Sequence, residues 1–518
     1  MLVYSAHLPE INRIAKTKYG QLRGAWGDTQ TITVFKGVPY AKPPIGPLRW
    51  QAPQEPDCWE GIRDAREFSG RSWQPEDTDP NAFYRKEFRA NPVQNTEDCL
   101  YLNIWTPEVK PGAGYPVMFW VHGGALHGGY GFEASFDGEA FCRKGVILVT
   151  INYRLGLLGF YASSQLSQES TDHVSGNYGY LDQIAALKWV KENIYNFGGD
   201  PENITVFGQS AGAGSVMNLV TSPLSRHLMR KAILQSGVFL FKFGSPGGIG
   251  MGFSNTPDIR SMEALGDEFM ASLGCSSLEE IRKLSPETLF TAPGTGFGGK
   301  FNFGPCVDGY VMEEEPALAF RNGHYADIPY MVGANADENE LTSLAKSPEE
   351  FLAQAQMTFG ADTQRFLDAL KMEIRTPKDV KEALKKLDVM RTGSQVFAQM
   401  QSLKNRKDTW VYYFCRKLPG DTKGSFHSAE LWYVFNTLRR CWRPMTPQDV
   451  SLADAMNTYW ANFAKNGHPN GGGLLEWPAW KDKDPKEMYF NENSHMEKAQ
   501  LSSVREFILN YITEGEQI

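Results

Sequence analysis

The feature that most constrains the fold is a strand pattern that runs, through one short turn, into a helix pattern. Residues 204–207 form a β-branched and aromatic run (ITVF), and residues 213–220 (AGSVMNLV) are typical of a helix. Two earlier runs of the strand kind lie at residues 117–121 and 146–150, and residues 180–196 place apolar side chains at three- and four-residue steps. This order of strand, helix and strand predicts a largely parallel sheet covered by helices.

The rest of the chain extends this sheet and interrupts it twice. Residues 329–333 (PYMVG) and 410–414 (WVYYF) are further strand candidates. The Gly- and Phe-rich region of about 239–308 and the charged, helix-like region of about 345–405 are predicted to be insertions that roof a pocket. Because no repeat, low-complexity tract or flexible linker divides the sequence, we expect residues 1–518 to form a single α/β domain.

The turn between strand and helix holds a serine with a glycine two residues to either side. Residues 208–212 read GQSAG and place Ser210 at the centre. A Gly-x-Ser-x-Gly match arises by chance on the order of once in five chains of this size, so the pentapeptide alone is weak evidence. Its position strengthens it, because a serine on a tight strand-to-helix turn needs small neighbours and the helix N-terminus points at the turn. Ser210 is therefore a candidate nucleophile.

A serine hydroxyl needs a base at neutral pH, and several histidines are candidates. His427 lies in a Gly-rich loop just beyond residues 410–414, at the edge of the sheet where catalytic loops gather. His324 and His468 occupy turn-like settings and are alternatives, whereas His122 is interpreted as structural. The remaining candidates near the chain ends are His7 and His495. The position of His427 after a strand favours it as the base.

The base in turn needs an acid that orients it, and three acidic residues compete for this role. Glu338 lies just past residues 329–333, in the sequence GANADENE, and Asp337 and Glu340 are immediate rivals. In this kind of architecture the acid and then the histidine follow the serine along the chain. The spacing agrees with that order but does not separate the three.

Acyl transfer also requires hydrogen-bond donors for the oxyanion that forms in the transition state, usually backbone N–H groups. The strand at residues 117–121 ends in His122-Gly123-Gly124-Ala125. A Gly-rich turn after an early strand is where hydrolases with a Gly-x-Ser-x-Gly turn supply these donors. This segment is therefore predicted to form an oxyanion hole.

Charge and cysteine content exclude several other function classes. The net charge is −8 and no long Lys/Arg run occurs, which argues against nucleic acid and anionic membranes as partners. The longest apolar runs fall well short of the roughly 20 residues of a membrane span. The seven cysteines are scattered without a C-x-x-C pair, so neither a disulfide framework nor a zinc site is predicted. Without a signal-peptide pattern at the N-terminus, we expect a cytoplasmic protein.

Taken together, these segments resemble the type-B carboxylesterase/cholinesterase family over most of the chain. The matching segments are residues 35–50 (FKGVPYAKPPIGPLRW), 97–105 (EDCLYLNIW), the HGG turn, 152–159 (NYRLGLLG), 176–214, 222–224, 235–237 and 305–309 (PCVDG). The resemblance implies an α/β-hydrolase fold with a mixed, largely parallel sheet and a deep active-site gorge. It also implies a serine carboxylesterase that acts on a small-molecule ester through an acyl-enzyme and requires no metal or organic cofactor.

Carried over residue by residue, the resemblance assigns the catalytic groups. It makes Ser210 the nucleophile and His427 the base, and it selects Glu338 as the acid. The oxyanion donors are then the backbone amides of Gly124, Ala125 and Ala211.

Three departures from the family pattern narrow the expected substrate. Ala125 stands where a third glycine is frequent, and Gln209 stands where glutamate commonly precedes the nucleophile. Ala90 occupies the position of the choline-binding tryptophan. Without an aromatic face and a carboxylate, a quaternary ammonium loses cation–π and Coulomb attraction. We therefore expect uncharged, fairly hydrophobic esters rather than choline esters; amides, thioesters and long-chain lipids are alternatives.

The cysteines depart from the extracellular members of the family as well. In those members the cysteine of the EDCLYLN segment pairs with one upstream. Cys99 is present here, but the partner position holds Ser72 or Trp73. This difference agrees with a reduced compartment and an intracellular, bacterial-type member.

Overall fold

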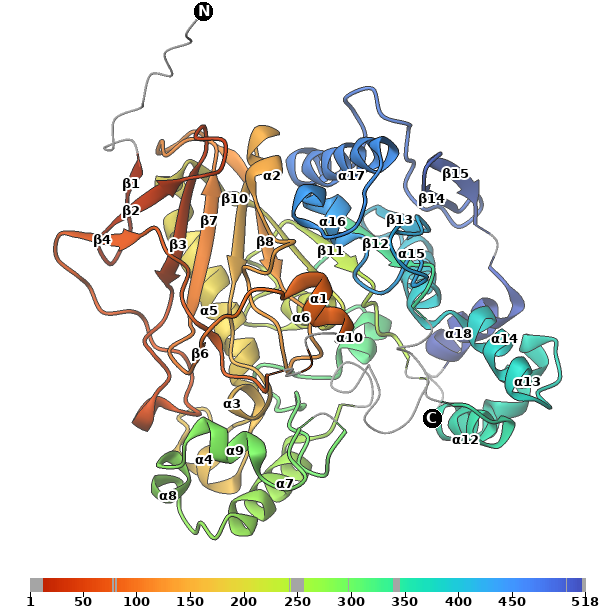
Figure 1. Cartoon of the computed structure of the whole chain (residues 1–518). Coiled ribbons are helices and arrows are strands. Elements are labelled where there is room, and N and C mark those ends of the chain that lie inside the picture. Colours follow the sequence, from red (N-terminus) through yellow and green to blue (C-terminus); the bar gives the residue numbers. More distant parts are fainter. Residues whose placement is uncertain are drawn as a thin grey trace, which may run out of the picture.

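The predicted strands lie at the centre of one mixed sheet, which is largely parallel (Figure 1). The computed structural model describes residues 13–514 except 77, 78, 80, 81, 242, 244–255, 297, 339–344 and 500. In sheet order the strands are β1 (Ile14–Lys16), β2 (Gln21–Trp26), β3 (Thr33–Pro39), β7 (Tyr101–Thr106), β9 (Ile147–Ile151), β8 (Tyr115–Val121), β10 (Gly199–Gln209), β11 (Lys231–Gln235), β12 (Tyr330–Asn335), β13 (Thr409–Phe414), β14 (Lys486–Phe490) and β15 (His495–Lys498), with β4 (Ile62–Ala65) beside β2. Every neighbouring pair from β9 to β14 is parallel.

Both faces of this sheet are buried, which explains why its central strands read as continuous apolar runs. In β8 the side chains of Val117, Phe119 and Val121 belong to one hydrophobic core, and those of Met118 and Trp120 belong to the other. A strand with one solvated face would instead alternate apolar and polar residues. The two cores hold β8 and β10 rigidly in the middle of the molecule.

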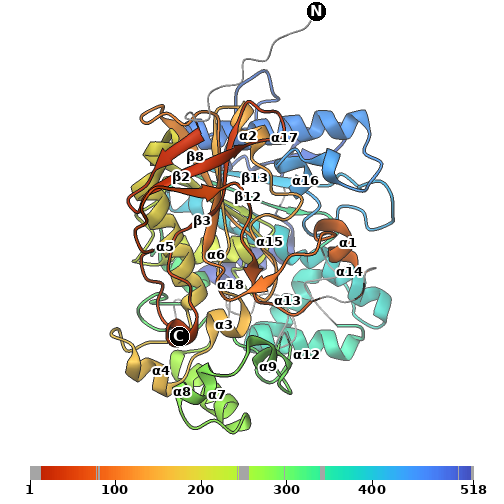
Figure 2. The same cartoon turned by 60° about the vertical axis from the view of Figure 1, so that its left-hand side comes forward.

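Helices form a layer on each face of the sheet. On one face α5 (Tyr178–Asn193) and α6 (Ala211–Thr221) pack against β10, and α15 (Val389–Leu403) packs against β12 and β13. On the other face lie α2 (Glu139–Arg143), α16 (Leu431–Val434) and α17 (Pro447–Asn466). Figure 2 views the same layers with the N-terminal strands brought forward.

The predicted insertions contain helices that stand away from the sheet. From the first come α7 (Ile259–Ser272), α8 (Leu278–Arg282) and α9 (Pro286–Thr291), with α7 beside α4 (Ser164–Glu169) at the bottom of Figure 1. From the second come α12 (Pro348–Phe359), α13 (Thr363–Leu370) and α14 (Pro377–Leu387), which group with α18 (Ser503–Glu514). The last part of that region, α15, instead packs on the sheet. Residues 244–255 of the first region lie outside the described residues, so its proposed roof is described only in part.

The remaining elements are short. They are α1 (Phe83–Phe88), α3 (Gly156–Phe160), α10 (Pro316–Asn322) and a separate two-stranded sheet of β5 (Arg71–Ser72) and β6 (Asn95–Thr96). Among the helices of the described residues, none combines the length and the apolar character that crossing a bilayer needs.

Candidate active site

Ser210 lies on the turn that joins β10 to α6, as the sequence predicted. Its backbone adopts φ 58° and ψ −127°. Residues other than glycine rarely adopt this conformation, which costs about 1–3 kcal/mol. The flanking glycines make this turn possible. A Cβ on Gly208 would lie 2.4 Å from the carbonyl oxygen of Gly212, and a Cβ on Gly212 would lie 2.1 Å from that of Val121. Both positions therefore exclude any side chain.

The turn after β8 lies directly beside the nucleophile turn. A Cβ on Gly123 would lie 2.6 Å from the carbonyl oxygen of Gln209, so the two turns are in close backbone contact. The next residues, Gly124 and Ala125, have φ values of 110° and 56°. The carbonyl oxygen of Gly124 accepts hydrogen bonds from the amides of His127 and Gly128 at 3.0 Å each, which closes the turn.

Three backbone N–H groups that the sequence predicted as oxyanion donors lie in these turns. The amides of Gly124, Ala125 and Ala211 have no hydrogen-bond acceptor among the described residues. The Ala211 amide is also the first of α6, whose positive dipole end faces the turn. Donors of this kind stabilise a developing oxyanion most when they are fixed in advance, as backbone groups are.

His427 and Glu338 come together from the loops that follow β13 and β12. Both side chains are buried, with 6% and 2% of their surface exposed. Glu338 Oε2 lies 3.4 Å from His427 Nδ1, which is longer than an ordinary hydrogen bond. Neither atom has another hydrogen-bond partner among the described residues. A small rotation of either side chain completes this bond, as commonly happens when a catalytic site binds its ligand.

The other oxygen of Glu338 is held by the backbone. Glu338 Oε1 accepts a hydrogen bond of 2.6 Å from the amide of Asn335, the last residue of β12. The rival acid Asp337 instead accepts a hydrogen bond of 2.8 Å from the amide of Ser425 and so supports the His427 loop from outside. The third rival, Glu340, lies outside the described residues. Of the acids that the structure describes, Glu338 is the one that faces the imidazole.

The competing histidines lie elsewhere. His324 pairs with Glu314 at the surface, His468 is exposed after α17, and His495 bonds Glu497 on β15. His122 is buried against Tyr153, and burial lowers its pKa to about 3, so it stays neutral. His7 lies outside the described residues.

A second buried carboxyl, which sequence reasoning missed, lies near Glu338 and His427. Glu430 is fully buried, and its carboxyl oxygens accept hydrogen bonds from the side-chain amides of Asn335 (2.5 Å) and Gln235 (3.3 Å). Burial, together with the charge of Glu338, raises the pKa of Glu430 to about 7. Asn335 also donates to the carbonyl oxygen of Phe426 at 2.8 Å, and this bond ties the His427 loop to β12. The one sequence signal was that Glu430 follows His427 by three residues.

The residue before Ser210 makes a contact that links the two parts of the candidate site. Gln209 is buried, and its amide nitrogen lies 3.2 Å from His427 Nε2. Its amide oxygen accepts a hydrogen bond of 3.1 Å from the hydroxyl of Ser428. The sequence identified Gln209 as a missing charge but did not predict this contact. Between the described atoms of Ser210 and His427 themselves there is no hydrogen bond.

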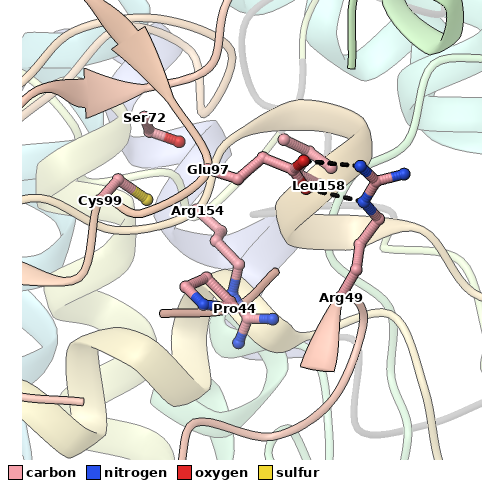
Figure 3. A pocket seen from close by; sticks show the side chains of 7 residues that line it. All are labelled: Pro44, Arg49, Ser72, Glu97, Cys99, Arg154 and Leu158. Atoms are coloured by element: carbon pink, nitrogen blue, oxygen red, sulfur yellow. Dashed lines mark hydrogen bonds and ion pairs between the residues drawn. The ribbon is translucent and has the colours of Figure 1, made fainter. Parts of the chain in front are cut away.

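The two remaining departures from the family pattern are placed as follows. Ala90 is exposed, two residues beyond α1. Cys99 and Ser72 line one small buried pocket together with Pro44, Arg49, Glu97, Arg154 and Leu158 (Figure 3). Trp73 instead stacks on Phe290, with ring centroids 4.7 Å apart. Ser72 therefore occupies the place opposite Cys99, all seven cysteines are free thiols, and burial raises the pKa of the Cys99 thiol to about 12.

The sheet and the nucleophile turn together are those of an α/β hydrolase. The chain belongs to the carboxylesterase family, whose model matches residues 12–507, and as a member it is a carboxylic ester hydrolase of the serine esterase type. It is 35% identical over 489 residues to the fumonisin B1 esterase of Sphingopyxis macrogoltabida, a match that covers 90% of this chain and 84% of that protein. It is 31% identical over 513 residues to the para-nitrobenzyl esterase of Bacillus subtilis (strain 168), covering 96% of this chain and 98% of the relative.

Solved structures agree with this assignment. A PNB esterase structure superposes with a TM-score of 0.79 at 28% identity, covering 96% of this chain and 99% of that chain. The carboxylesterase EST55 of Geobacillus stearothermophilus superposes with a TM-score of 0.76 at 31% identity, covering 95% of this chain and 99% of the other. The predicted family and fold class are thereby confirmed.

Proposed function

We propose that the chain hydrolyses uncharged, fairly hydrophobic carboxylic esters through the triad Ser210, His427 and Glu338. The observation that carries the proposal is the convergence on Ser210: its strained turn lies against the turn of the free amides, and its neighbour Gln209 contacts the imidazole of His427. A nucleophile, a base with an acid behind it, and fixed oxyanion donors are the parts that acyl transfer needs.

The reaction proceeds in two steps. Ser210 Oγ attacks the ester carbonyl carbon while its proton passes to His427 Nε2, and Glu338 stabilises the imidazolium through Nδ1. The carbonyl oxygen becomes an oxyanion that accepts hydrogen bonds from the amides of the two turns. The C–O bond to the alcohol then breaks, and the alcohol leaves with the proton from Nε2. Water repeats the sequence on the acyl-enzyme, with His427 again as base, and releases the acid.

Two features of the chain support neutral substrates. Gln209 places an amide where a carboxylate would attract a cation, and the exposed Ala90 supplies no aromatic face. The relatives are named for quite different esters, among them fumonisin B1, para-nitrobenzyl esters and cocaine. What those names share is the ester bond, so we propose that the alcohol portion is less constrained than the carbonyl chemistry.

Labelling with a fluorophosphonate, which reacts with activated serines, tests the triad. We expect the wild-type protein to be labelled once, and Ser210→Ala to lose both the label and turnover by a factor of about 10⁴–10⁶. Equal labelling of Ser210→Ala, or an unlabelled wild-type protein, would refute the proposal in favour of an inactive scaffold.

The substrate class is tested separately with aryl esters of about two to twelve acyl carbons and with choline esters. Faster turnover of short- to medium-chain neutral esters than of long-chain or choline esters supports the proposal. A preference for the longest chains, or rapid hydrolysis of choline esters, contradicts the proposed substrate while leaving the triad intact.

A further inference from the structure

The contact between Gln209 and His427 determines where the ring proton of the base lies. An amide nitrogen donates hydrogen bonds and does not accept them. In the amide orientation that the structure shows, the Gln209 nitrogen lies 3.2 Å from His427 Nε2, so that ring nitrogen presents its lone pair. The ring proton is then on Nδ1, which faces Glu338 Oε2 at 3.4 Å. This is the tautomer that a base needs in order to take a proton at Nε2.

The other end of the Gln209 amide also has a partner. Ser428, whose backbone has φ 78°, directs its hydroxyl to Gln209 Oε1 at 3.1 Å. Gly123 packs closely against the amide from another side: a Cβ on Gly123 would lie only 3.3 Å from Gln209 Oε1. The Gln209 backbone is fixed by its parallel pairing with Gln235 on β11. The side chain is therefore confined between the oxyanion turn and the His427 loop.

We propose that Gln209 is a positioning residue that holds His427 with its proton on Nδ1 and its lone pair on Nε2, and that it yields Nε2 to the Ser210 hydroxyl when the ester binds. This inference rests on the proposed function. After the proton of Ser210 has moved to Nε2, half a turn of the amide lets Oε1 accept that N–H and lets the amide nitrogen donate to Ser428 Oγ. A neutral amide thus serves both protonation states, whereas a carboxylate serves only the protonated one.

The charges around the imidazole decide the sign of the test. Two carboxyls act on His427: Glu338, 3.4 Å from Nδ1 after β12, and Glu430, just before α16. A third carboxylate at position 209 would face Nε2 and favour the imidazolium, which cannot act as a base. We therefore expect Gln209→Glu to move the acid limb of the pH profile of kcat/KM to higher pH by about one unit or more.

The matched apolar variant is expected to shift the profile in the opposite direction. Gln209→Met keeps the length of the side chain but offers the imidazolium no acceptor, so the acid limb moves to lower pH while kcat falls and KM changes little. Gln364→Glu, on the exposed surface of α13, adds the same charge far from the site and leaves the profile unchanged. If Gln209 had only a structural role, both variants would lower stability or kcat, but their acid limbs would not shift in opposite directions.

Nitrogen NMR of histidine-labelled protein provides a readout that does not depend on activity. The His427 signal, assigned by its loss in His427→Asn, reports the tautomer in the wild-type protein and the titration midpoint in each folded variant. An Nδ1–H tautomer with midpoints shifted up in Gln209→Glu and down in Gln209→Met supports the proposal. An Nε2–H tautomer, unmoved midpoints, or shifts of the same sign in the two variants overturn it. Because the tautomer is read in the wild-type protein, this part of the test stands even if a variant folds poorly. An unlabelled Ser210 in the fluorophosphonate test would instead refute the proposed function.

Discussion

The two sides of the catalytic centre are held by different kinds of interaction. Around Ser210 and the Gly123–Gly124 turn, backbone packs on backbone, and absent side chains make the close approach possible. Around His427 and Glu338, the contacts run through side chains: Glu338 accepts from the backbone amide of Asn335, Gln209 contacts the imidazole, and Ser428 donates to Gln209. The key distance, between Glu338 Oε2 and His427 Nδ1, is a loose 3.4 Å.

This difference separates what each side contributes. Backbone donors and a strained turn cost nothing to reorganise during the reaction, so they suit an oxyanion that forms transiently. Side chains can rotate and change protonation state, as proton transfer requires. A side chain added at a glycine on the backbone side should therefore damage the fold, whereas a change to the polar groups on the other side should damage chemistry while the fold survives.

The acid of the triad gives the most severe test of the side-chain half. We expect Glu338→Gln to lower kcat by on the order of 10³–10⁴, because the imidazolium loses its counter-charge and the ring its orientation. Asp337→Asn is the matched control and should cost less than about tenfold, since it only weakens the bond to the Ser425 amide. Steady-state kinetics with a neutral aryl ester measures both. The reverse order of effects would identify Asp337 as the acid.

The backbone half is tested by a single methyl group. In Gly212→Ala the new Cβ would lie 2.1 Å from the carbonyl oxygen of Val121, and we expect a destabilisation of about 3 kcal/mol or more. Gly304→Ala is the control, because nothing lies within 4 Å of a Cβ there. Thermal unfolding and soluble yield report the effect. A Gly212→Ala protein as stable as Gly304→Ala would show that the turn tolerates rearrangement.

Changing pH should act on the side-chain half alone. Burial and the charge of Glu338 raise the pKa of Glu430 from 4.5 to about 7, so its contribution to stability is complete below pH 4.5 and is lost as the pH rises through 7. We expect Glu430→Gln to remove on the order of 2–3 kcal/mol of this pH dependence between about pH 5 and 8. Unfolding midpoints across that range measure it.

The control for this experiment is Glu279→Gln on α8. Glu279 is exposed, and its hydrogen bond with Lys283 lowers its pKa, so it does not titrate in the tested range. Its curve should run parallel to that of the wild-type protein. A parallel curve for Glu430→Gln would mean that Glu430 is ionised throughout.

The smallest effect is expected at Ala125. Its φ of 56° is strained for alanine, so Ala125→Gly removes strain of about 1 kcal/mol but adds freedom to the unfolded chain. We expect a net stabilisation below about 1 kcal/mol and activity within about twofold, because the amide donor is retained. Differential scanning calorimetry and kinetics decide this. A large fall in kcat would mean that the methyl group shapes the oxyanion turn.

The same division explains what could be predicted from the sequence. The glycines at 208, 212 and 123–124 could be recognised in the sequence because each is needed where two backbone segments come close together. The central strands were predicted within a few residues of β8, β9, β10, β12 and β13, because burial on both faces produces uninterrupted apolar runs. The short β11 (KAILQ) and the N-terminal strands carry weaker patterns and were missed.

The side-chain contacts were not predictable in this way. Glu338 could be separated from Asp337 only by the family resemblance, because adjacent carboxylates differ in direction and not in spacing. Asn335 at the end of β12 bonds Glu430, and Gln209 at the end of β10 contacts His427, and no local pattern records either contact. Sequence periodicity predicts which faces are buried, whereas tertiary geometry decides which polar groups meet there.

The position of β10 has a consequence for how the protein loses activity on warming. β10 lies between β8 and β11 in the interior of the sheet, so its amides should be among the last to exchange with solvent. The segments that carry His427 and Glu338 follow the ends of their strands, and we expect them to open by smaller fluctuations than the global unfolding of the sheet. Turnover should therefore fade at temperatures where the strand that leads to Ser210 is still protected, which makes inactivation a local event that precedes denaturation.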